Sequence, residues 1–286
     1  MLKHAGARLL DDRDVRGVRA ALAADPVMSC MVAARVENSG LDPWRLGGEL
    51  WGFACGPPVS DLGAELEGLC FSGANLVPLR GGPSAIRAFA ERAARRARCC
   101  SSLVGPAEQV LGLWSELCES WGPARDERPN QPLLVLAEQP LVSCDPLVRR
   151  VRPDELDRYL PAAVAMFTEE VGVDPRLPDG GGGYRARVAE LLTAGRAFAR
   201  FDNGEVVFKA EIGAMSATVG QIQGVWVHPD WRGQGLAAGA TAAVAGRLQR
   251  MGRVASLYVN AYNVPARATY RRVGFTQVGC FATVLF

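Results

Sequence analysis

The sequence predicts a protein of two α/β domains, the first over residues 1–147 and the second over residues 148–286. Three observations lead to this fold class. The chain has 286 residues, more than one ordinary core needs. Apolar residues make up 49% of it and charged residues 22%, as in globular proteins. Segments with strand and helix periodicity alternate through both halves, an order that builds a sheet flanked by helices.

The first half contains a strand–helix–strand–helix run. Its segments are residues 75–80, 84–98, 99–104 and 106–121. Residues 123–132 hold three prolines and a cluster of charges, which predicts an exposed loop. A short apolar strand at residues 133–137 follows, and we place the domain boundary within residues 140–150. The first domain is interpreted as a degenerate copy of the second or as an unrelated α/β domain.

The second half repeats the alternation more clearly. A helix is predicted to end near Val171, because apolar side chains recur at helical spacing from Leu156 to Phe167. Residues 174–183, with four consecutive glycines and two prolines, predict a loop. The remaining predicted segments are a helix at 184–193, strands at 197–201, 206–212 and 218–227, a helix at 235–251, a strand at 255–260, a helix at 264–273 and a terminal strand pair.

Charge and hydropathy exclude several classes of protein. The net charge of +2 is too small to predict a nucleic-acid partner. The longest apolar stretch, residues 236–246, is too short to cross a membrane, and residues 1–10 run directly into charged residues, unlike a secretory signal. The cysteines form no Cys-x-x-Cys pair, which predicts no metal site. We therefore expect a cytoplasmic protein without a metal or a membrane partner.

The most informative segment is VWVHPDWRGQGLA, residues 225–237. A β-branched run leads into a glycine-rich turn and then into a helix of small residues. The amides of the first helical turn lack partners within the helix, and the helix dipole is positive there. Gly233 and Gly235 allow a ligand to approach the backbone, and Arg232 adds a positive charge. These features predict a site for a pyrophosphate.

Two motifs carry a resemblance to a known family. The spacing Arg232–x–x–Gly235–x–Ala237 resembles the cofactor-binding signature of the GNAT superfamily of N-acetyltransferases. Residues 263–275, NVPARATYRRVGF, resemble the downstream motif of the same family, in which Asn263 caps a helix and Tyr270 lies two turns later on the same face. The whole chain also resembles an actinobacterial group that has a poorly characterised region before its GNAT domain.

The resemblance implies a mixed, mostly antiparallel sheet in which two parallel strands, residues 218–227 and 255–260, splay apart. Acetyl-CoA would lie in this wedge as the cosubstrate, with Gly224 as a bulge that opens it. The cofactor-binding residues implied are Val225, Trp226, Val227, Arg232, Gly233, Gln234, Gly235, Leu236, Ala237, Asn263 and Tyr270. The partners implied are acetyl-CoA and an amine, on a small molecule or a protein, and a homodimer is compatible with the sequence.

The reaction implied is direct attack of a primary amine on the thioester. Tyr270 is predicted to protonate the leaving thiolate. Many relatives carry a glutamate base at the position of Gln221, so Glu169, Glu170 and Glu211 are the candidates for the base, with an ordered water chain as the alternative. The competing interpretation is a module that binds acetyl-CoA as a sensor or scaffold without turnover.

Overall fold

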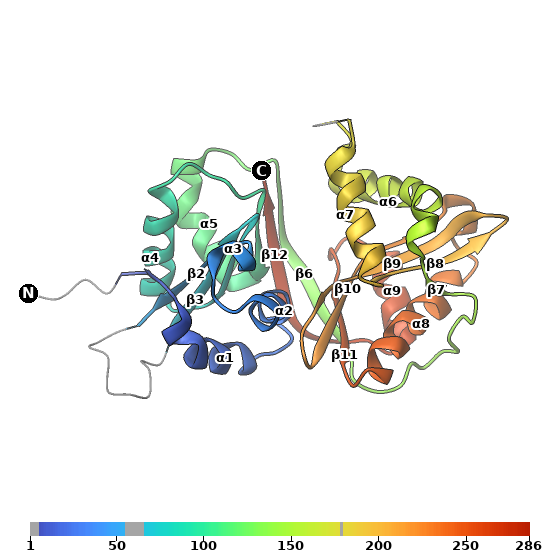
Figure 1. Ribbon diagram of the computed structural model, residues 1–286, viewed down its shortest axis with the longest axis horizontal. Coiled ribbons are helices and arrows are strands. Elements are labelled where there is room, and N and C mark those ends of the chain that lie inside the picture. Colours follow the sequence, from blue (N-terminus) through green and yellow to red (C-terminus); the bar gives the residue numbers. More distant parts are fainter. Residues whose placement is uncertain (1–5, 55–65, 178–179) are drawn as a thin grey trace, which may run out of the picture. The chain divides into compact units, whose positions relative to one another are not determined.

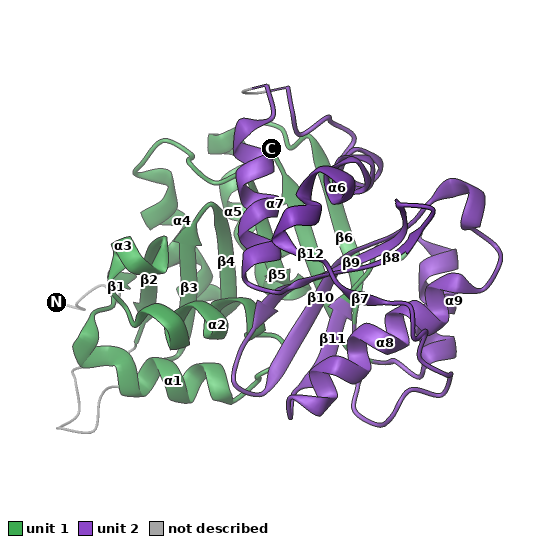
Figure 2. Cartoon of the chain, turned by 45° about the vertical axis from the view of Figure 1, so that its right-hand side comes forward, with its two compact units in different colours: residues 1–133, 258–262, 277–286 green, residues 134–257, 263–276 purple. Residues whose placement is uncertain are grey.

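The chain folds into two compact units in the computed structural model, which describes residues 6–54, 66–177 and 180–286 (Figure 2). The first unit contains residues 1–133, 258–262 and 277–286, and the second contains residues 134–257 and 263–276. The units therefore do not follow a single cut in the sequence, because two late segments of the chain lie in the first unit.

The first unit is built on one sheet with the strand order β1-β2-β3-β4-β5-β12-β6 (Figure 1). Its elements are β1 (Arg8–Leu9), α1 (Val15–Ala23), α2 (Cys30–Ser39), α3 (Pro43–Leu46), β2 (Gly48–Phe53), β3 (Gly68–Gly73), β4 (Asn75–Arg80), α4 (Pro83–Ala94), β5 (Ser102–Pro106), α5 (Ala107–Trp121), β6 (Asp126–Leu136) and β12 (Thr276–Leu285). β2, β3 and β4 form an antiparallel meander, and β4 is parallel to β5 only at the pairs Asn75–Ser102 and Leu76–Leu103.

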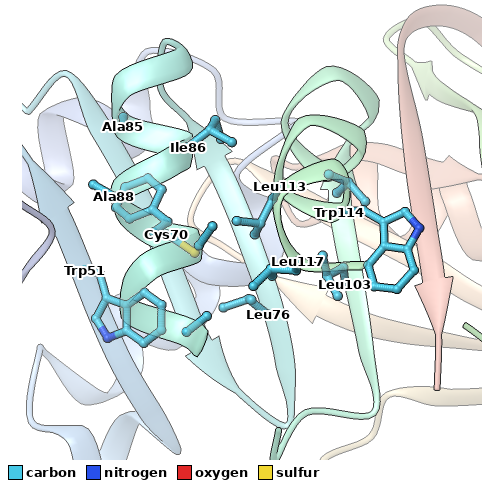
Figure 3. Packing of buried hydrophobic residues seen from close by; sticks show 14 of the residues in the cluster. Trp51, Cys70, Leu76, Ala85, Ile86, Ala88, Leu103, Leu113, Trp114 and Leu117 are labelled. Atoms are coloured by element: carbon cyan, nitrogen blue, oxygen red, sulfur yellow. The ribbon is translucent and has the colours of Figure 1, made fainter. Parts of the chain in front are cut away.

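Helices α4 and α5 cover one face of this sheet and form an apolar core with it (Figure 3). Phe89 of α4 and Leu113 of α5 are fully buried, and Leu103 of β5 lies beneath them. Of the two arginines of α4, Arg87 is exposed and Arg92 is partly buried over the Trp51 ring. Helix α5 follows the sequence prediction closely, whereas α4 ends at Ala94, before the predicted end at residue 98.

The prediction of an exposed loop at residues 123–132 is wrong, because β6 begins at Asp126. The carbonyls of Asn130 and Pro132 accept hydrogen bonds from the amides of Ala261 (3.1 Å) and Val259 (3.2 Å). The side chain of Gln131 is buried: its Nε2 donates to Asn260 Oδ1 (2.8 Å), and its Oε1 accepts from Thr283 Oγ1 (2.6 Å). The segment is a strand because residues more than 120 positions later supply its partners.

The second unit contains a sheet with the order β11-β10-β9-β8-β7, with α6 and α7 on one face and α8 and α9 on the other (Figure 1). Its elements are β7 (Arg149–Arg150), α6 (Leu156–Val171), α7 (Gly182–Thr193), β8 (Ala197–Asp202), β9 (Glu205–Met215), β10 (Val219–Val227), α8 (Leu236–Arg250), β11 (Val254–Tyr258) and α9 (Val264–Val273). These bounds confirm the predicted helices and strands of this half to within a few residues. Residues 178–179 of the predicted loop lie outside the described residues.

The end of the chain differs from its prediction. Instead of a strand pair there is one strand, β12, which pairs antiparallel with β5 of the first unit from Phe281–Pro106 to Leu285–Ser102. Sequence periodicity identifies a strand but not its partner, which explains the error.

The two halves of the sequence contain the same order of elements. Each has a short strand, helices, three antiparallel strands, and then a parallel pair joined by a helix and followed by a further helix and strand. This confirms the strand and helix order predicted for the first half. The last strand of the second half, β12, lies in the first unit. The mixed sheets flanked by helices confirm the predicted fold class.

Replacing Gln131 should destabilise the first unit, because its amide is the only described link between Thr283 and Asn260. We expect Gln131→Leu to cost about 1–3 kcal/mol in free energy of unfolding, since it removes the hydrogen-bond partner of the buried Thr283 hydroxyl and of the partly buried Asn260 amide. Urea unfolding would measure this, and Gln277→Leu on the exposed part of β12 is the control. Equal stability of Gln131→Leu and the wild type would contradict a structural role for the link.

Candidate active site

A β-bulge interrupts the pairing of β10 with β9 in the second unit. Gln223 pairs with Glu211 and Trp226 pairs with Lys209, so two residues of β10 oppose the single residue Ala210. Gly224 lies in this bulge with φ +56°, a conformation that favours glycine. The sequence prediction of a bulge at Gly224 is confirmed.

The bulge lies where β10 separates from β11. These strands are parallel and pair only over Val219–Gln221 of β10, opposite Val254–Ser256 of β11. β10 then continues to Val227, whereas β11 ends at Tyr258. This arrangement confirms the predicted pair of splayed parallel strands. The backbone of Val225 and Val227 therefore lies along a part of β10 that β11 does not pair with.

The turn after β10 is open on its outer side. Gly233 (φ +75°) and Gly235 (φ +79°) have no heavy atom within 4 Å of the position a Cβ would take. Gly235 is the N-cap residue of α8, and no side chain caps this end of the helix. The first-turn amides, which include those of Leu236 and Ala237, are therefore available to an anion in the way that the sequence predicts.

Arg232 makes contacts that the sequence did not predict. Its Nε donates to the carbonyl of Val227 (3.0 Å), and its Nη2 donates to both carboxylate oxygens of Glu169 on α6 (2.8 and 3.0 Å). The Trp226 indole also donates to Glu169 Oε1 (3.1 Å). Gln234 donates to the carbonyl of Asp230 (2.8 Å). Arg232 thus braces the turn against β10 and α6, while the backbone amides form the open part of the site.

Helix α9 begins as the motif predicts. Asn263 Oδ1 accepts a hydrogen bond from the amide of Ala266 (3.1 Å), which confirms its role as the cap. Tyr270 is buried on this helix and packs against Phe275, with ring centroids 6.0 Å apart. Burial, and then the nearby charge of Glu170, raise the pKa of Tyr270 well above that of a free phenol. The side chain therefore keeps its proton near neutral pH.

The three candidate carboxylates lie in different surroundings. Glu169 is held by Arg232 and Trp226. Glu211 is buried; burial raises its pKa, but the ion pair with Lys209 and the hydrogen bond from Tyr159 lower it more, so the net pKa is below the usual value. Glu170 is the candidate whose charge acts on Tyr270. The structure therefore engages Glu169 and Glu211 in ion pairs, whereas Glu170 acts on the pKa of Tyr270 through its charge.

Sequence reasoning missed Lys209 and Met166, which lie directly beneath the bulge. A Cβ on Gly224 would lie 3.1 Å from Lys209 Nζ and 3.0 Å from Met166 Cε. The signal for Lys209 was a lone basic residue within the apolar strand VVFKAEI, residues 206–212. A charge inside such a run needs a buried partner, so the lone lysine predicts a carboxylate nearby.

No group of three or more His, Cys, Asp or Glu side chains in the described ranges is arranged to hold a metal ion. Within the same ranges, no helix is both long and apolar enough to span a membrane.

Solved structures share this fold over nearly the whole chain. An acetyltransferase of the GNAT family from Colwellia psychrerythraea has a TM-score of 0.56 and 11% identity over 98% of this chain and 99% of that chain. A GCN5-related N-acetyltransferase from Sphaerobacter thermophilus has a TM-score of 0.57 and 20% identity over 97% and 94%. A tandem GNAT protein from the clavulanic acid biosynthesis pathway has a TM-score of 0.51 and 15% identity over 97% of both chains. At these identities the likeness shows the fold, which is that of a GNAT protein.

Family models identify both halves of the sequence. Residues 167–275 match the acetyltransferase (GNAT) family, and residues 48–159 match a domain of unknown function, DUF4081. The chain therefore contains a GNAT acetyltransferase domain, with a DUF4081 domain preceding it. A domain of this family implies acyl transfer. A comparison with curated proteins finds no match.

Filling the open turn should weaken cofactor binding. We expect Gly235→Val to raise the Kd for acetyl-CoA at least about tenfold, equivalent to one lost charge-assisted hydrogen bond. Gly252→Val is the matched control, because Gly252 follows α8, has φ +73° and has no heavy atom within 4 Å of a Cβ position. Both variants carry the strain of a left-handed residue, about 1–2 kcal/mol. If calorimetry gives equal Kd values for the two folded variants, the pyrophosphate binds somewhere other than this turn.

Proposed function

We propose that this protein is an N-acetyltransferase that transfers the acetyl group of acetyl-CoA to a primary amine of a small molecule or protein. The observation that carries the proposal is the continuity of the wedge with the turn. The strand that leaves β11 at the bulge leads directly into the uncapped, open N-terminus of α8. This is a path for a ligand that has an anionic end and an extended arm, and it lies in the part of the chain that matches the GNAT family.

Each part of acetyl-CoA has a proposed set of contacts. The amides of residues 233–237 would bind the pyrophosphate, with Arg232 holding the turn in shape. The backbone of Val225 and Val227 would pair with the pantetheine arm, and Trp226 faces the apolar core on the α6 side. The thioester would then lie beside the bulge at Gly224. Asn263 would contribute by fixing the start of α9 and so the place of Tyr270.

The proton balance of the reaction follows from the same residues. A free lysine-type amine has a pKa near about 10.4, so it must lose a proton before it attacks the thioester carbon. The C–N bond then forms, the C–S bond breaks, and the thiolate takes a proton from Tyr270. The nitrogen loses a second proton as the amide forms, and this proton passes through Glu170 or water and restores Tyr270. The products are an amide and free CoA thiol, with no net proton released from a neutral amine and one released from an ammonium substrate.

The first unit is proposed to be a partner that carries the same element order but binds no cofactor. Helix α4 begins at Pro83, which has no amide hydrogen to donate. A Cβ on Gly81 would lie 2.8 Å from the Ala85 Cβ, so the start of this turn is packed against its own helix, whereas Gly82 is open. In the second unit both glycines of the turn, Gly233 and Gly235, are open.

Calorimetry with acetyl-CoA should therefore give a stoichiometry of one per chain, because Pro83 removes an amide donor from the first turn of α4 and Gly81 packs against Ala85, whereas the turn before α8 has neither feature. A stoichiometry of two would contradict the proposal for the first unit. Binding that persists unchanged when Gly235 is replaced would point to the first unit as the site.

Turnover should depend on the hydroxyl of Tyr270. We expect Tyr270→Phe to lower kcat by roughly 10²–10⁴-fold, the usual range for general acid catalysis, with little change in the Kd for acetyl-CoA. The ring and its packing against Phe275 remain, so stability should be preserved. The measurement is thiol release across a panel of primary amines. If a substrate is found and the phenylalanine variant turns over at the wild-type rate, Tyr270 is a packing residue.

The same panel separates an enzyme from a sensor or scaffold. A protein that binds acetyl-CoA tightly and releases no thiol with any amine or protein extract would support the binding module.

A further inference from the structure

Lys209 is a completely buried lysine on β9. Its side chain has 0% of its surface exposed, and its Nζ lies 2.7 Å from Glu211 Oε1. The Tyr159 ring lies 5.5 Å from the same Nζ, and the Tyr159 hydroxyl donates to Glu211 Oε1 (3.1 Å). An ammonium group has three N–H donors. Within the described residues, Nζ makes this ion pair but no hydrogen bond of good geometry, so its donors are not fully used.

Stability alone does not account for this pair. Removing two charges from water is costly, and well-packed apolar residues of similar volume often replace a buried ion pair at no loss of stability. The surrounding residues Met166, Trp226 and Tyr159 already form an apolar core. An apolar residue at position 209 would fit these surroundings, so the charge calls for a further explanation.

The position of the ammonium group supplies that explanation. Lys209 pairs with Trp226, immediately after the bulge, and its Nζ lies 3.1 Å from the position of a Cβ on Gly224. Glu211 Oε2 lies 3.5 Å from the same position. Because glycine has no side chain, only the β10 backbone separates the ammonium group from the edge of the strand that leaves β11. The proposed function places the thioester beside this backbone.

We propose that Lys209 is a positioning residue of the acyl site, acting through the Gly224 bulge on the carbonyl of the bound acyl group. Its charge orients the bulge peptides and favours negative charge on the acyl oxygen, which develops as the amine nitrogen bonds to the carbonyl carbon. The negative charge on the acyl oxygen disappears when the C=O bond re-forms and the C–S bond breaks. Glu211 holds the ammonium group in place through their ion pair. This inference rests on the proposed function.

Removing the charge of Lys209 should change the binding of acetyl-CoA but not that of CoA, because the two ligands differ only in the acyl group. In the variant Lys209→Met/Glu211→Leu both charges are replaced by apolar side chains of similar volume. We expect it to unfold in urea at or above the wild-type midpoint. The Kd for CoA should be unchanged, whereas the preference for acetyl-CoA over CoA should fall about tenfold, as for one lost interaction with a charged group. With an amine substrate, kcat should fall by roughly 10²-fold or more, as when one charge-stabilising donor is removed.

Tyr159→Phe is the matched control. It removes a hydrogen bond from the same carboxylate but retains the ammonium group, so the ratio of the two Kd values should stay at the wild-type value. Lys209→Arg retains the charge and should recover part of the preference for acetyl-CoA. If the apolar double variant does not fold, Lys209→Gln/Glu211→Gln removes both charges with polar side chains and gives the same comparison.

Two results would overturn the inference, and they differ from each other. A folded, uncharged variant with the wild-type ratio of Kd values and the wild-type kcat would make the ion pair purely structural, while the proposed function would stand. A wild-type protein that binds neither acetyl-CoA nor CoA would overturn the proposed function itself.

Discussion

The bulge at Gly224 is the constraint on which the second unit depends. By placing two residues opposite one, it turns β10 away from the regular pairing that it begins with β11 at Val219–Gln221. The strand then carries its unpaired edge to Val227 and into the turn before α8. Without the bulge the parallel strands could continue side by side, and neither the wedge nor its connection to the helix N-terminus would form.

Two ion pairs lie along the part of β10 that has separated from β11. Beneath the bulge, the buried pair Lys209–Glu211 lies on the α6 side of the sheet. At the end of the strand, Arg232 binds Glu169 of α6 and the carbonyl of Val227. Glu169 and Glu211, which residue type alone marks as candidate bases, are thus engaged in ion pairs. Their partners hold the backbone in shape. The charge of the third candidate, Glu170, contributes to the raised pKa of Tyr270.

The two units share an order of elements, but the turns after their fourth strands differ. In the second unit Gly233 and Gly235 are open to a ligand, whereas in the first Gly81 packs against Ala85, and Pro83 removes an amide. A repeated fold therefore does not imply a repeated site. The first unit also includes β12, so its sheet is complete only when the end of the chain has been added.

The sequence alone determined the features that depend on neighbouring residues. Helix α9 was predicted at its observed bounds because Asn263 caps it and the apolar spacing is local, and the open turn followed from glycines at adjacent positions. The tertiary structure decided the pairing of segments distant in sequence. Residues 126–132 are a strand only because the backbone near Asn260 and the side chain of Thr283 reach them. The partners of Lys209 and Arg232 depend on packing across strands and helices, which periodicity does not specify.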